Sequence, residues 1–225
     1  MAVGIVGGTG PAGRALGARL AAGGATVVLG SRDAARAQAA AAEISARWPA
    51  LHLPITGAAN EEAASQDIVV LATVWDAVVA TAVQLSPQLT GRVVVSMANA
   101  ITRVGGEFQA LVPVRGSLAA TIQAAVPGCR VTAAFHHLPA GRLGELDQPI
   151  EADVLVCADD DAAGEATVRL VESIPGLRAC RAGSLASAGA VEALTAVLVN
   201  VNLRYRAHTT LHLSGLPAAG GGARR

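Results

Sequence analysis

A glycine pattern near the N-terminus constrains the fold of this chain more than any other feature. The apolar segment Ala2–Val6 is followed almost at once by Gly8-Thr9-Gly10-Pro11-Ala12-Gly13, which matches the spacing G-x-G-x-x-G. The stretch from Pro11 to Ala22 then repeats apolar residues at helical spacing. A glycine turn between a buried strand and a helix is the context in which this spacing indicates dinucleotide binding.

Each glycine of the pattern has a separate expected task. Gly8 permits the tight turn, Gly10 lets a pyrophosphate approach the backbone, and Gly13 lets the helix pack closely on the strand. The start of the helix adds free N–H groups and a partial positive charge. We therefore expect the whole turn to contact the dinucleotide, that is, Gly8, Thr9, Gly10, Pro11, Ala12 and Gly13.

The rest of the chain alternates short apolar segments with helical ones. Apolar strands are predicted at 26–29, 68–72, 92–97 and 131–135, with a weaker strand near 51–55. This alternation predicts an α/β fold with a doubly wound parallel sheet of the Rossmann type and a small C-terminal α/β domain. The predicted division is a Rossmann domain at 1–145, a small C-terminal domain at 146–217 and a disordered Gly/Ala-rich tail at 218–225.

The end of the second strand favours NADP over NAD. An NAD site usually has an acidic residue there, which binds the ribose hydroxyls. This chain instead has Ser31 and Arg32, with Arg36 one helical turn later, and a hydroxyl with two guanidinium groups suits a 2′-phosphate. Asp33 comes too late for the ribose and is expected to cap the next helix.

Charge and lysine content exclude several function classes. The 17 basic and 17 acidic residues balance, so nothing indicates a nucleic-acid partner. All basic residues are arginine, which excludes Schiff-base lysine chemistry and a P-loop lysine. The only tyrosine, Tyr205, has Thr209 four residues later, so the Tyr-x-x-x-Lys pair of short-chain dehydrogenases is excluded as well.

Cysteine use and hydropathy suggest where the protein resides. Cys129, Cys157 and Cys180 are widely spaced and are expected to be buried, reduced thiols without a metal. The N-terminus lacks a charged segment before an apolar stretch, and we expect no membrane span. A cytoplasmic protein is predicted.

The carboxyl ends of the later strands should line the rest of the crevice. This rule selects residues after three strands: Thr73 and Val74, then Met97, Ala98 and Asn99, then His136 and His137. One histidine could act as a general acid or hydrogen-bond donor, and the alternative is a strand-end histidine satisfied by the backbone. No third ligand at a recognisable spacing accompanies the two histidines, so no metal site is predicted.

Several segments together resemble the NADPH-dependent reductases of coenzyme F420, an 8-hydroxy-5-deazaflavin. They are Ile5–Gly10, Val28–Arg32, Phe135–Ala140, Val154–Asp160 and Ala182–Ser187, and the resemblance runs over nearly the whole chain. It implies a Rossmann domain with a small C-terminal domain, a homodimer, and reversible hydride transfer between NADPH and F420. It also implies that Thr9, Gly10, Pro11, Ala12, Ser31, Arg32 and Arg36 bind NADP.

The residues expected in the crevice agree with this chemistry. Hydride transfer between two flat rings needs the protein to hold them face to face at roughly 3–3.5 Å, and the cofactors rather than an acid–base pair carry the chemistry. Two alternatives stay open at this point. One is an NADP-dependent reductase of another small acceptor, such as an imine, a keto acid, a flavin or a metal. The other is a non-catalytic protein that senses NADPH, because a fold alone does not define an activity.

Overall fold

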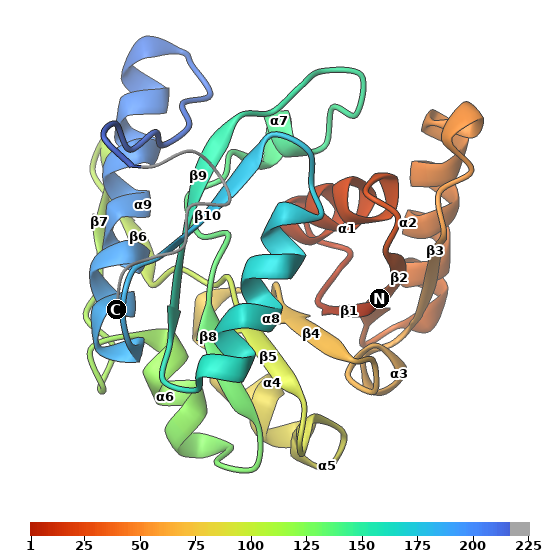
Figure 1. Cartoon of the computed structure of the whole chain (residues 1–225), viewed down its shortest axis with the longest axis horizontal. Helices are drawn as coiled ribbons and strands as arrows, with labels where there is room; N and C mark the ends of the chain where they lie inside the picture. Colours follow the sequence, from red (N-terminus) through yellow and green to blue (C-terminus); the bar gives the residue numbers. More distant parts are fainter. Residues whose placement is uncertain (217–225) are drawn as a thin grey trace.

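A computed structural model describes residues 1–216, in which eight strands form one sheet in the order β10-β9-β8-β5-β4-β1-β2-β3 (Figure 1). The strands of this sheet are β1 Ala2–Val6, β2 Thr26–Ser31, β3 Ile55–Ala59, β4 Ile68–Leu71, β5 Val93–Ser96, β8 Arg130–Ala133, β9 Ala152–Ala158 and β10 Leu177–Arg181. The predicted tail at 218–225 lies outside the described residues.

The sheet is parallel except at one junction. Every neighbouring pair from β3 to β8 is parallel, and so is the pair β9–β10. β9 runs antiparallel to β8 through the pairs Thr132 with Ala158 and Ala133 with Cys157. The strand order reverses direction at β1 and β4, as a doubly wound sheet requires. The predicted fold class, a Rossmann-type α/β sheet, is confirmed.

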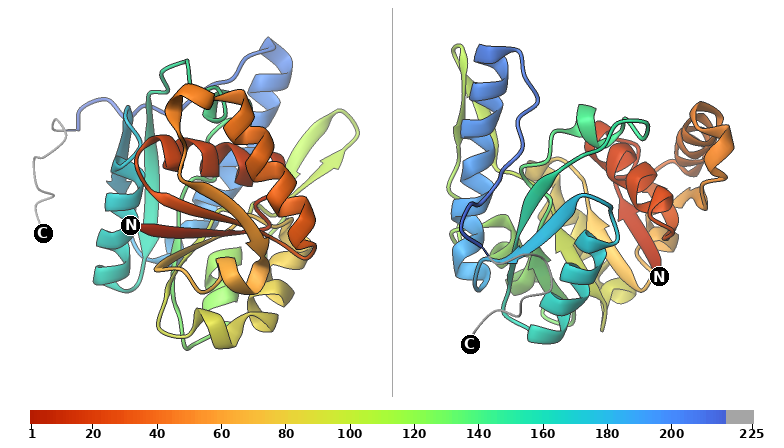
Figure 2. Two further views of the ribbon diagram at one scale, coloured as in Figure 1. Left: turned by 90° about the vertical axis from the view of Figure 1, so that its right-hand side faces the viewer. Right: turned by 45° about the horizontal axis from the view of Figure 1, so that its top comes forward.

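Helices cover both faces of the sheet (Figure 2). The apolar side chains of α1, α2, α7 and α8 pack in one core with residues such as Ile5, and those of α3, α4, α5, α6 and α9 pack in a second core with residues such as Val69. The helices are α1 Pro11–Ala22, α2 Ala34–Arg47, α3 Asn60–Ala63, α4 Trp75–Gln84, α5 Ser86–Leu89, α6 Leu118–Ala125, α7 Ala140–Leu143, α8 Asp161–Glu172 and α9 Leu185–Tyr205.

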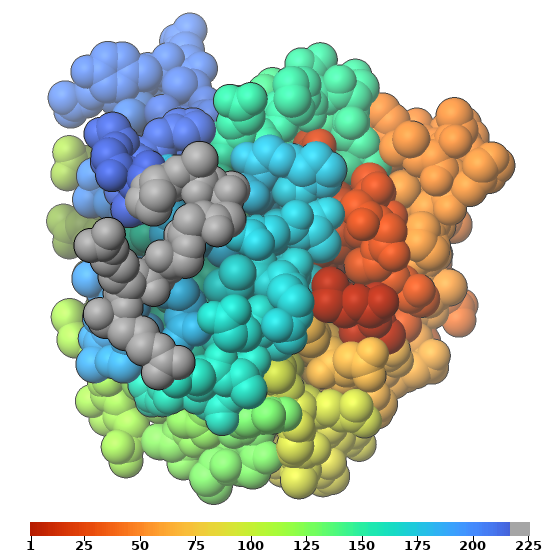
Figure 3. Space-filling model, viewed as in Figure 1, coloured from red at the N-terminus to blue at the C-terminus, as the bar shows by residue number. Residues whose placement is uncertain are grey.

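The C-terminal strands extend the same sheet. β9 and β10 are tied by an ion pair in which Arg178 Nε and Nη2 donate to the Asp153 carboxylate at 2.5 and 2.7 Å. α8 also reaches the N-terminal segment, because a methyl group on Gly23 would lie 2.3 Å from the Ser173 carbonyl oxygen, and the two regions touch in Figure 3. The division into domains at 1–145 and 146–217 stays a prediction.

A buried arginine fastens α1 to the segment between β8 and β9. Arg19 is 7% exposed, and its guanidinium donates hydrogen bonds to the carbonyl oxygens of Leu143, Gln148, Arg142 and Glu145 at 2.7–3.2 Å. Four carbonyl acceptors replace the water that this cation loses on burial. Desolvation is the main reason why the pKa of Arg19 lies below its ordinary value. The last turn of the helix that follows the glycine turn is thereby fixed to this segment.

Two elements differ from the sequence-based expectation. The strand expected near 51–55 begins only at Ile55, because Pro49–Leu51 forms a 3-10 turn instead. Gly57 in β3 lets α2 approach closely, since a methyl group there would lie 2.1 Å from the Ala37 carbonyl.

The second difference is an unpredicted antiparallel hairpin, β6 Ile101–Val104 and β7 Glu107–Ala110, which lies beside α9 (Figure 2).

Candidate functional site

The glycine turn after β1 has little room for side chains. Gly7 has a left-handed φ of 74°, and the Gly8 N–H donates to the carbonyl oxygens of Ile5 and Gly30 at 3.0 and 2.8 Å. A methyl group on Gly8 would lie 2.8 Å from the Ile5 oxygen, and one on Gly13 would lie 2.8 Å from Gly8 Cα. These contacts give the tight turn and the close helix packing that the sequence pattern predicts.

Gly10 differs from its neighbours, because space remains beside it. A methyl group there would meet only the Gly7 oxygen, at 3.6 Å. Gly10 is also the residue before α1, whose start has no side-chain cap and no acidic residue in its first turn. The turn therefore offers an anion an approachable backbone and an uncapped helix N-terminus.

The end of β2 carries the predicted phosphate-binding side chains. Ser31 is the last residue of β2 and is buried, whereas Arg32 and Arg36 are exposed. Within residues 1–216 neither arginine forms a salt bridge, so both guanidinium groups face solvent. Asp33 caps α2 by accepting a hydrogen bond from the Ala35 N–H at 3.0 Å, which confirms its expected capping role.

The predicted residues after β4 lie next to the glycine turn. β4 pairs with β1, and a methyl group on Gly7 would lie 2.7 Å from Thr73 Cγ2. The Thr73 hydroxyl is buried and has no hydrogen-bond partner among the described residues. Val74 follows with 68% of its surface exposed. Thr73 therefore brings an unpaired polar atom to the base of the turn.

The segment after β5 has mostly buried side chains. Met97 and Ala98 are 8% and 5% exposed and belong to the two cores on opposite faces of the sheet. A ligand at this strand end would meet their backbone atoms more readily than their side chains. Asn99 reaches the segment after β8, where its Nδ2 donates to the His136 carbonyl oxygen at 3.1 Å. Asn99 Oδ1 is buried without a described partner.

The two adjacent histidines have different surroundings. Both are 4% exposed. His137 Nε2 accepts a hydrogen bond from the Leu155 N–H of β9 at 3.4 Å, so its ring helps to satisfy a strand edge. Burial lowers the pKa of His137 to about 4, although Asp153 acts in the opposite direction. His137 thus fits the structural alternative considered from the sequence.

His136 has both ring nitrogens buried without a hydrogen-bond partner in residues 1–216. Burial, with the neighbouring His137, lowers the pKa of His136 to about 3, so the ring is neutral at pH 7. A neutral imidazole still offers one donor and one acceptor. Buried polar atoms without partners are uncommon in folded proteins, and they occur at sites that bind ligands or water.

The backbone around His136 is firmly held. Phe135, which precedes it, is 1% exposed and has a left-handed φ of 66°, a costly conformation for a bulky residue. The His136 carbonyl oxygen accepts a second hydrogen bond, from the Thr195 hydroxyl of α9 at 3.1 Å. Sequence reasoning missed Thr195, although a buried threonine in the apolar run of α9 is a signal that could have been followed.

The ends of three neighbouring strands therefore present unpaired polar atoms. β4, β5 and β8 are consecutive in the sheet, and they lead to Thr73, Asn99 and His136. Together with the open backbone at Gly10 they form a row that lies along the carboxyl edge of the sheet. This arrangement can bind a long ligand with an anionic end and a flat polar end.

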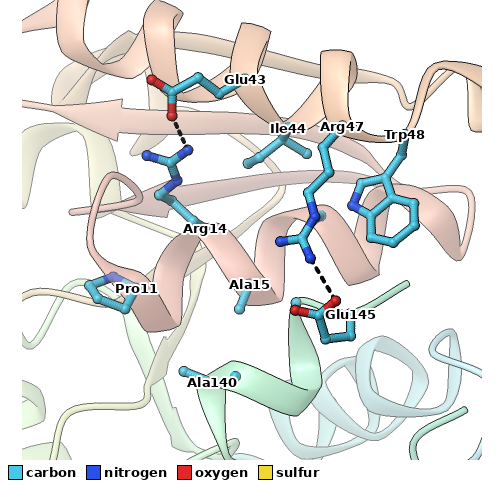
Figure 4. A pocket seen from close by; sticks show the side chains of 12 residues that line it. Pro11, Arg14, Ala15, Glu43, Ile44, Arg47, Trp48, Ala140 and Glu145 are labelled. Atoms are coloured by element: carbon cyan, nitrogen blue, oxygen red, sulfur yellow. Dashed lines mark hydrogen bonds and ion pairs between the residues drawn. The ribbon is translucent and has the colours of Figure 1, made fainter. Parts of the chain in front are cut away.

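A separate cavity of about 230 Å³ lies on the outer side of α1, between α2 and the segment 140–145 (Figure 4). Ion pairs of Arg14 with Glu43 and of Arg47 with Glu145 cross it, the latter at 2.6 Å. Pro11 is the one predicted site residue in its lining. Because its cations are already paired with carboxylates, we place no ligand there.

Within residues 1–216, no group of three or more histidine, cysteine, aspartate or glutamate side chains could hold a metal ion. α9 is long and apolar enough to cross a bilayer by length and composition, with a mean hydropathy of 1.4 over its most apolar stretch. A third of that stretch is buried in the fold. Such a helix occurs in the cores of globular proteins too.

Comparisons with known proteins agree on one family. Residues 2–100 match the family model described as NADP oxidoreductase, coenzyme F420-dependent. An F420-dependent NADP reductase from Methanocaldococcus jannaschii is 32% identical over 93% of this chain and 96% of its own, and one from Methanothermobacter thermautotrophicus is 33% identical over 96% of each.

Solved structures share the fold. A protein assigned as an F420-dependent NADP reductase from Arthrobacter sp. FB24 has a TM-score of 0.75 at 24% identity, covering 94% of this chain and 98% of its own. An imine reductase from Streptomyces aurantiacus has a TM-score of 0.59 at 21% identity. That match covers 91% of this chain but only 62% of the imine reductase.

Proposed function

The chain belongs to the family of F420-dependent NADP reductases, and we infer from this premise that it transfers a hydride reversibly between NADPH and coenzyme F420. The observation that carries the inference is the match of at least 31% identity to three such reductases over at least 93% of this chain. The described site is consistent with it. NADPH supplies the hydride from its nicotinamide, and the deazaflavin ring accepts it.

We propose that the glycine turn and the end of β2 hold the two phosphate-bearing parts of NADP. The backbone N–H groups of Thr9, Ala12 and Gly13 would face the pyrophosphate, while Gly8, Gly10 and Pro11 would shape the turn around it. Ser31, Arg32 and Arg36 would bind the 2′-phosphate. The two exposed guanidinium groups support this assignment, because no carboxylate among the described residues pairs with them.

We propose further that the strand ends position the reacting rings. Thr73, Asn99 and His136 offer unpaired polar atoms, while Val74, Met97 and Ala98 line the same edge with apolar side chains or backbone. A neutral His136 would donate or accept a hydrogen bond without moving a proton. His137, predicted with His136 to orient the rings or stabilise charge, would act indirectly, since its ring accepts the Leu155 N–H of β9.

The activity is tested by mixing the protein with NADPH and oxidised F420 and following the visible absorbance of the deazaflavin. The expected result is bleaching that depends on protein concentration and that reverses when reduced F420 is mixed with NADP. Parallel assays replace F420 with a cyclic imine, a keto acid or a free flavin. NADPH binding with no bleaching would favour the sensor, and faster NADPH oxidation with another acceptor would favour a different reductase.

We also propose that the protein is a cytoplasmic homodimer with no nucleic-acid or membrane partner. The second half of α9 supports a protein partner, because Val197, Leu203 and Tyr205 are 56%, 55% and 72% exposed. The same helix carries Glu192, whose carboxylate accepts hydrogen bonds from Leu118 and Ala119 of α6, which favours packing in a protein over crossing a bilayer. Light scattering after gel filtration measures the mass, and a monomer at micromolar concentration would contradict the dimer.

A further inference from the structure

We propose that Asn60 is a positioning residue that fixes the glycine turn in the conformation that binds the dinucleotide. The inference rests on the NADP site proposed above. It adds to that site a residue that lies outside both the glycine turn and the segment from Ser31 to Arg36. Asn60 is the first residue of α3, directly after β3, and is 53 residues distant from the turn in the sequence.

One hydrogen bond links Asn60 to the turn. Asn60 Oδ1 accepts from the Gly7 N–H at 3.2 Å, and the asparagine is only 7% exposed. The amide orientation is fixed, because Gly7 can only donate and the opposite orientation would bring two donors together. Gly7 is also the residue with the left-handed φ of 74°, at which the chain leaves β1. The bond therefore holds the residue that sets the direction of the whole turn.

Asn60 also touches the end of β2. A methyl group on Gly30 would lie 2.9 Å from Asn60 Oδ1, and the Gly30 carbonyl oxygen accepts the Gly8 N–H at 2.8 Å. Ser31 is paired in register with Ala59, the residue just before Asn60. The same side chain therefore contacts the turn proposed for the pyrophosphate and the strand end proposed for the 2′-phosphate.

Thr73 contacts the turn as well, because a methyl group on Gly7 would lie 2.7 Å from its Cγ2. The turn is consequently packed by Thr73 and hydrogen-bonded by Asn60. Without Asn60 Oδ1, the Gly7 N–H loses its described acceptor and can rotate away from the binding conformation. Loss of one such hydrogen bond weakens binding by about 5- to 10-fold when the conformation that it selects is the one that binds.

The test compares Asn60→Ala, Asn60→Asp and a matched control, Asn200→Ala. Asn200 of α9 also hydrogen-bonds the backbone, accepting from the Phe108 N–H at 2.7 Å and donating to the Phe108 carbonyl oxygen at 2.8 Å. This contact joins α9 to the hairpin of β6 and β7 and does not involve the glycine turn. NADPH affinity is measured by titration. The kcat and the KM for F420 are measured in steady-state assays at saturating NADPH. Exchange of the Gly7 amide hydrogen is measured by NMR without ligand.

We expect Asn60→Ala to raise the Kd of NADPH about 5- to 10-fold and to accelerate exchange of the Gly7 amide, with kcat and the KM for F420 within about 2-fold. Asn60→Asp keeps an acceptor and should leave exchange of the Gly7 amide close to that of the original protein, while its negative charge beside the proposed phosphate sites lowers NADPH affinity. Asn200→Ala should leave the Kd of NADPH unchanged. If Asn60→Ala does not fold, Asn60→Ser, whose hydroxyl is too short to reach Gly7, takes its place with the same expectations.

Three results would overturn the inference. They are an unchanged Kd of NADPH in Asn60→Ala, a kcat that falls as much as the affinity does, and an equal loss of affinity in Asn200→Ala. If the unmodified protein itself does not bind NADPH, the proposed function fails and the inference with it. A normal affinity in the unmodified protein together with an unchanged Asn60→Ala variant overturns the inference alone.

Discussion

Replacing Glu192 by glutamine should change how the stability of this protein depends on pH. Glu192 lies in α9, is 3% exposed, and accepts hydrogen bonds from the Leu118 and Ala119 N–H groups at 2.9 and 3.2 Å. Burial raises the pKa of Glu192 from 4.5 to about 7, although the two hydrogen bonds act in the opposite direction. The folded protein therefore binds a proton that the unfolded chain releases between these two values.

The sign follows from the raised pKa. The contribution of Glu192 to the free energy of unfolding is complete below pH 4.5 and is lost as the pH rises through about 7. One unit of pKa difference corresponds to about 1.4 kcal/mol, so the protein should lose roughly 2–3 kcal/mol from this group between pH 5 and pH 8. Glutamine resembles the protonated carboxyl in shape and does not titrate, so the variant should lack this loss.

The two buried histidines have the opposite effect on stability. Burial lowers the pKa of His136 to about 3 and of His137 to about 4, so the unfolded chain binds protons that the folded protein does not. Their contribution is present at pH 8 and is lost as the pH falls from about 6.5, towards about 4 for His137 and about 3 for His136. The plot of unfolding free energy against pH thus contains opposing contributions from Glu192 and from the histidines. Subtracting the unfolding free energy of Glu192→Gln from that of the original protein leaves the contribution of the Glu192 carboxyl.

The assay is urea unfolding at several pH values from 5 to 8, followed by circular dichroism. The free energy of unfolding of Glu192→Gln, relative to that of the original protein, should rise by roughly 2–3 kcal/mol between pH 5 and pH 8. A difference between the two proteins that does not vary with pH would refute the reasoning, because it would mean that Glu192 has the same pKa in the folded and the unfolded chain.

Three other outcomes follow from the site and its support. Arg32→Gln should weaken NADPH binding about 10-fold and leave NADH binding unchanged, and an equal loss for both nucleotides in a fluorescence titration would contradict a 2′-phosphate contact. His137→Ala should lower the melting temperature more than His136→Ala, whereas His136→Ala should lower kcat more; the reverse order in calorimetry and steady-state assays would exchange their roles. Arg19→Leu leaves four carbonyl oxygens without their donor and should cost about 3 kcal/mol of unfolding free energy, so a melting temperature within a degree of the original would exclude this fastening role.

The sequence predicted the sheet best where local pattern and burial coincide. The strand at 68–72 is apolar throughout, and the strand at 92–97 is apolar apart from Arg92 and Ser96. The structure places β4 and β5 there in the middle of the sheet. The hairpin of β6 and β7 was missed because its strands are four residues long and half polar, although Gly105-Gly106 is a recognisable hairpin turn. The antiparallel direction of β9 depends on the path of the chain in space, which no local pattern records.

The site was predictable only in part for a related reason. A glycine spacing reports on adjacent residues, so the turn from Gly8 to Gly13 and its need for small residues could be read directly. The contact of Asn60 with Gly7 joins the start of α3 to the turn after β1, and it appears only when the sheet is assembled. The difference between His136 and His137 likewise depends on the Leu155 N–H, which β9 brings to one ring and not to the other.

Isotope transfer tests the proposed reaction most directly. NADPH carrying deuterium at the transferred position of the nicotinamide is incubated with the protein and oxidised F420 in ordinary water, and the reduced deazaflavin is analysed by mass spectrometry and NMR. Direct transfer between rings that the protein holds against each other predicts one deuterium atom at C5 of the product. A product that carries only solvent hydrogen at that carbon would contradict the account.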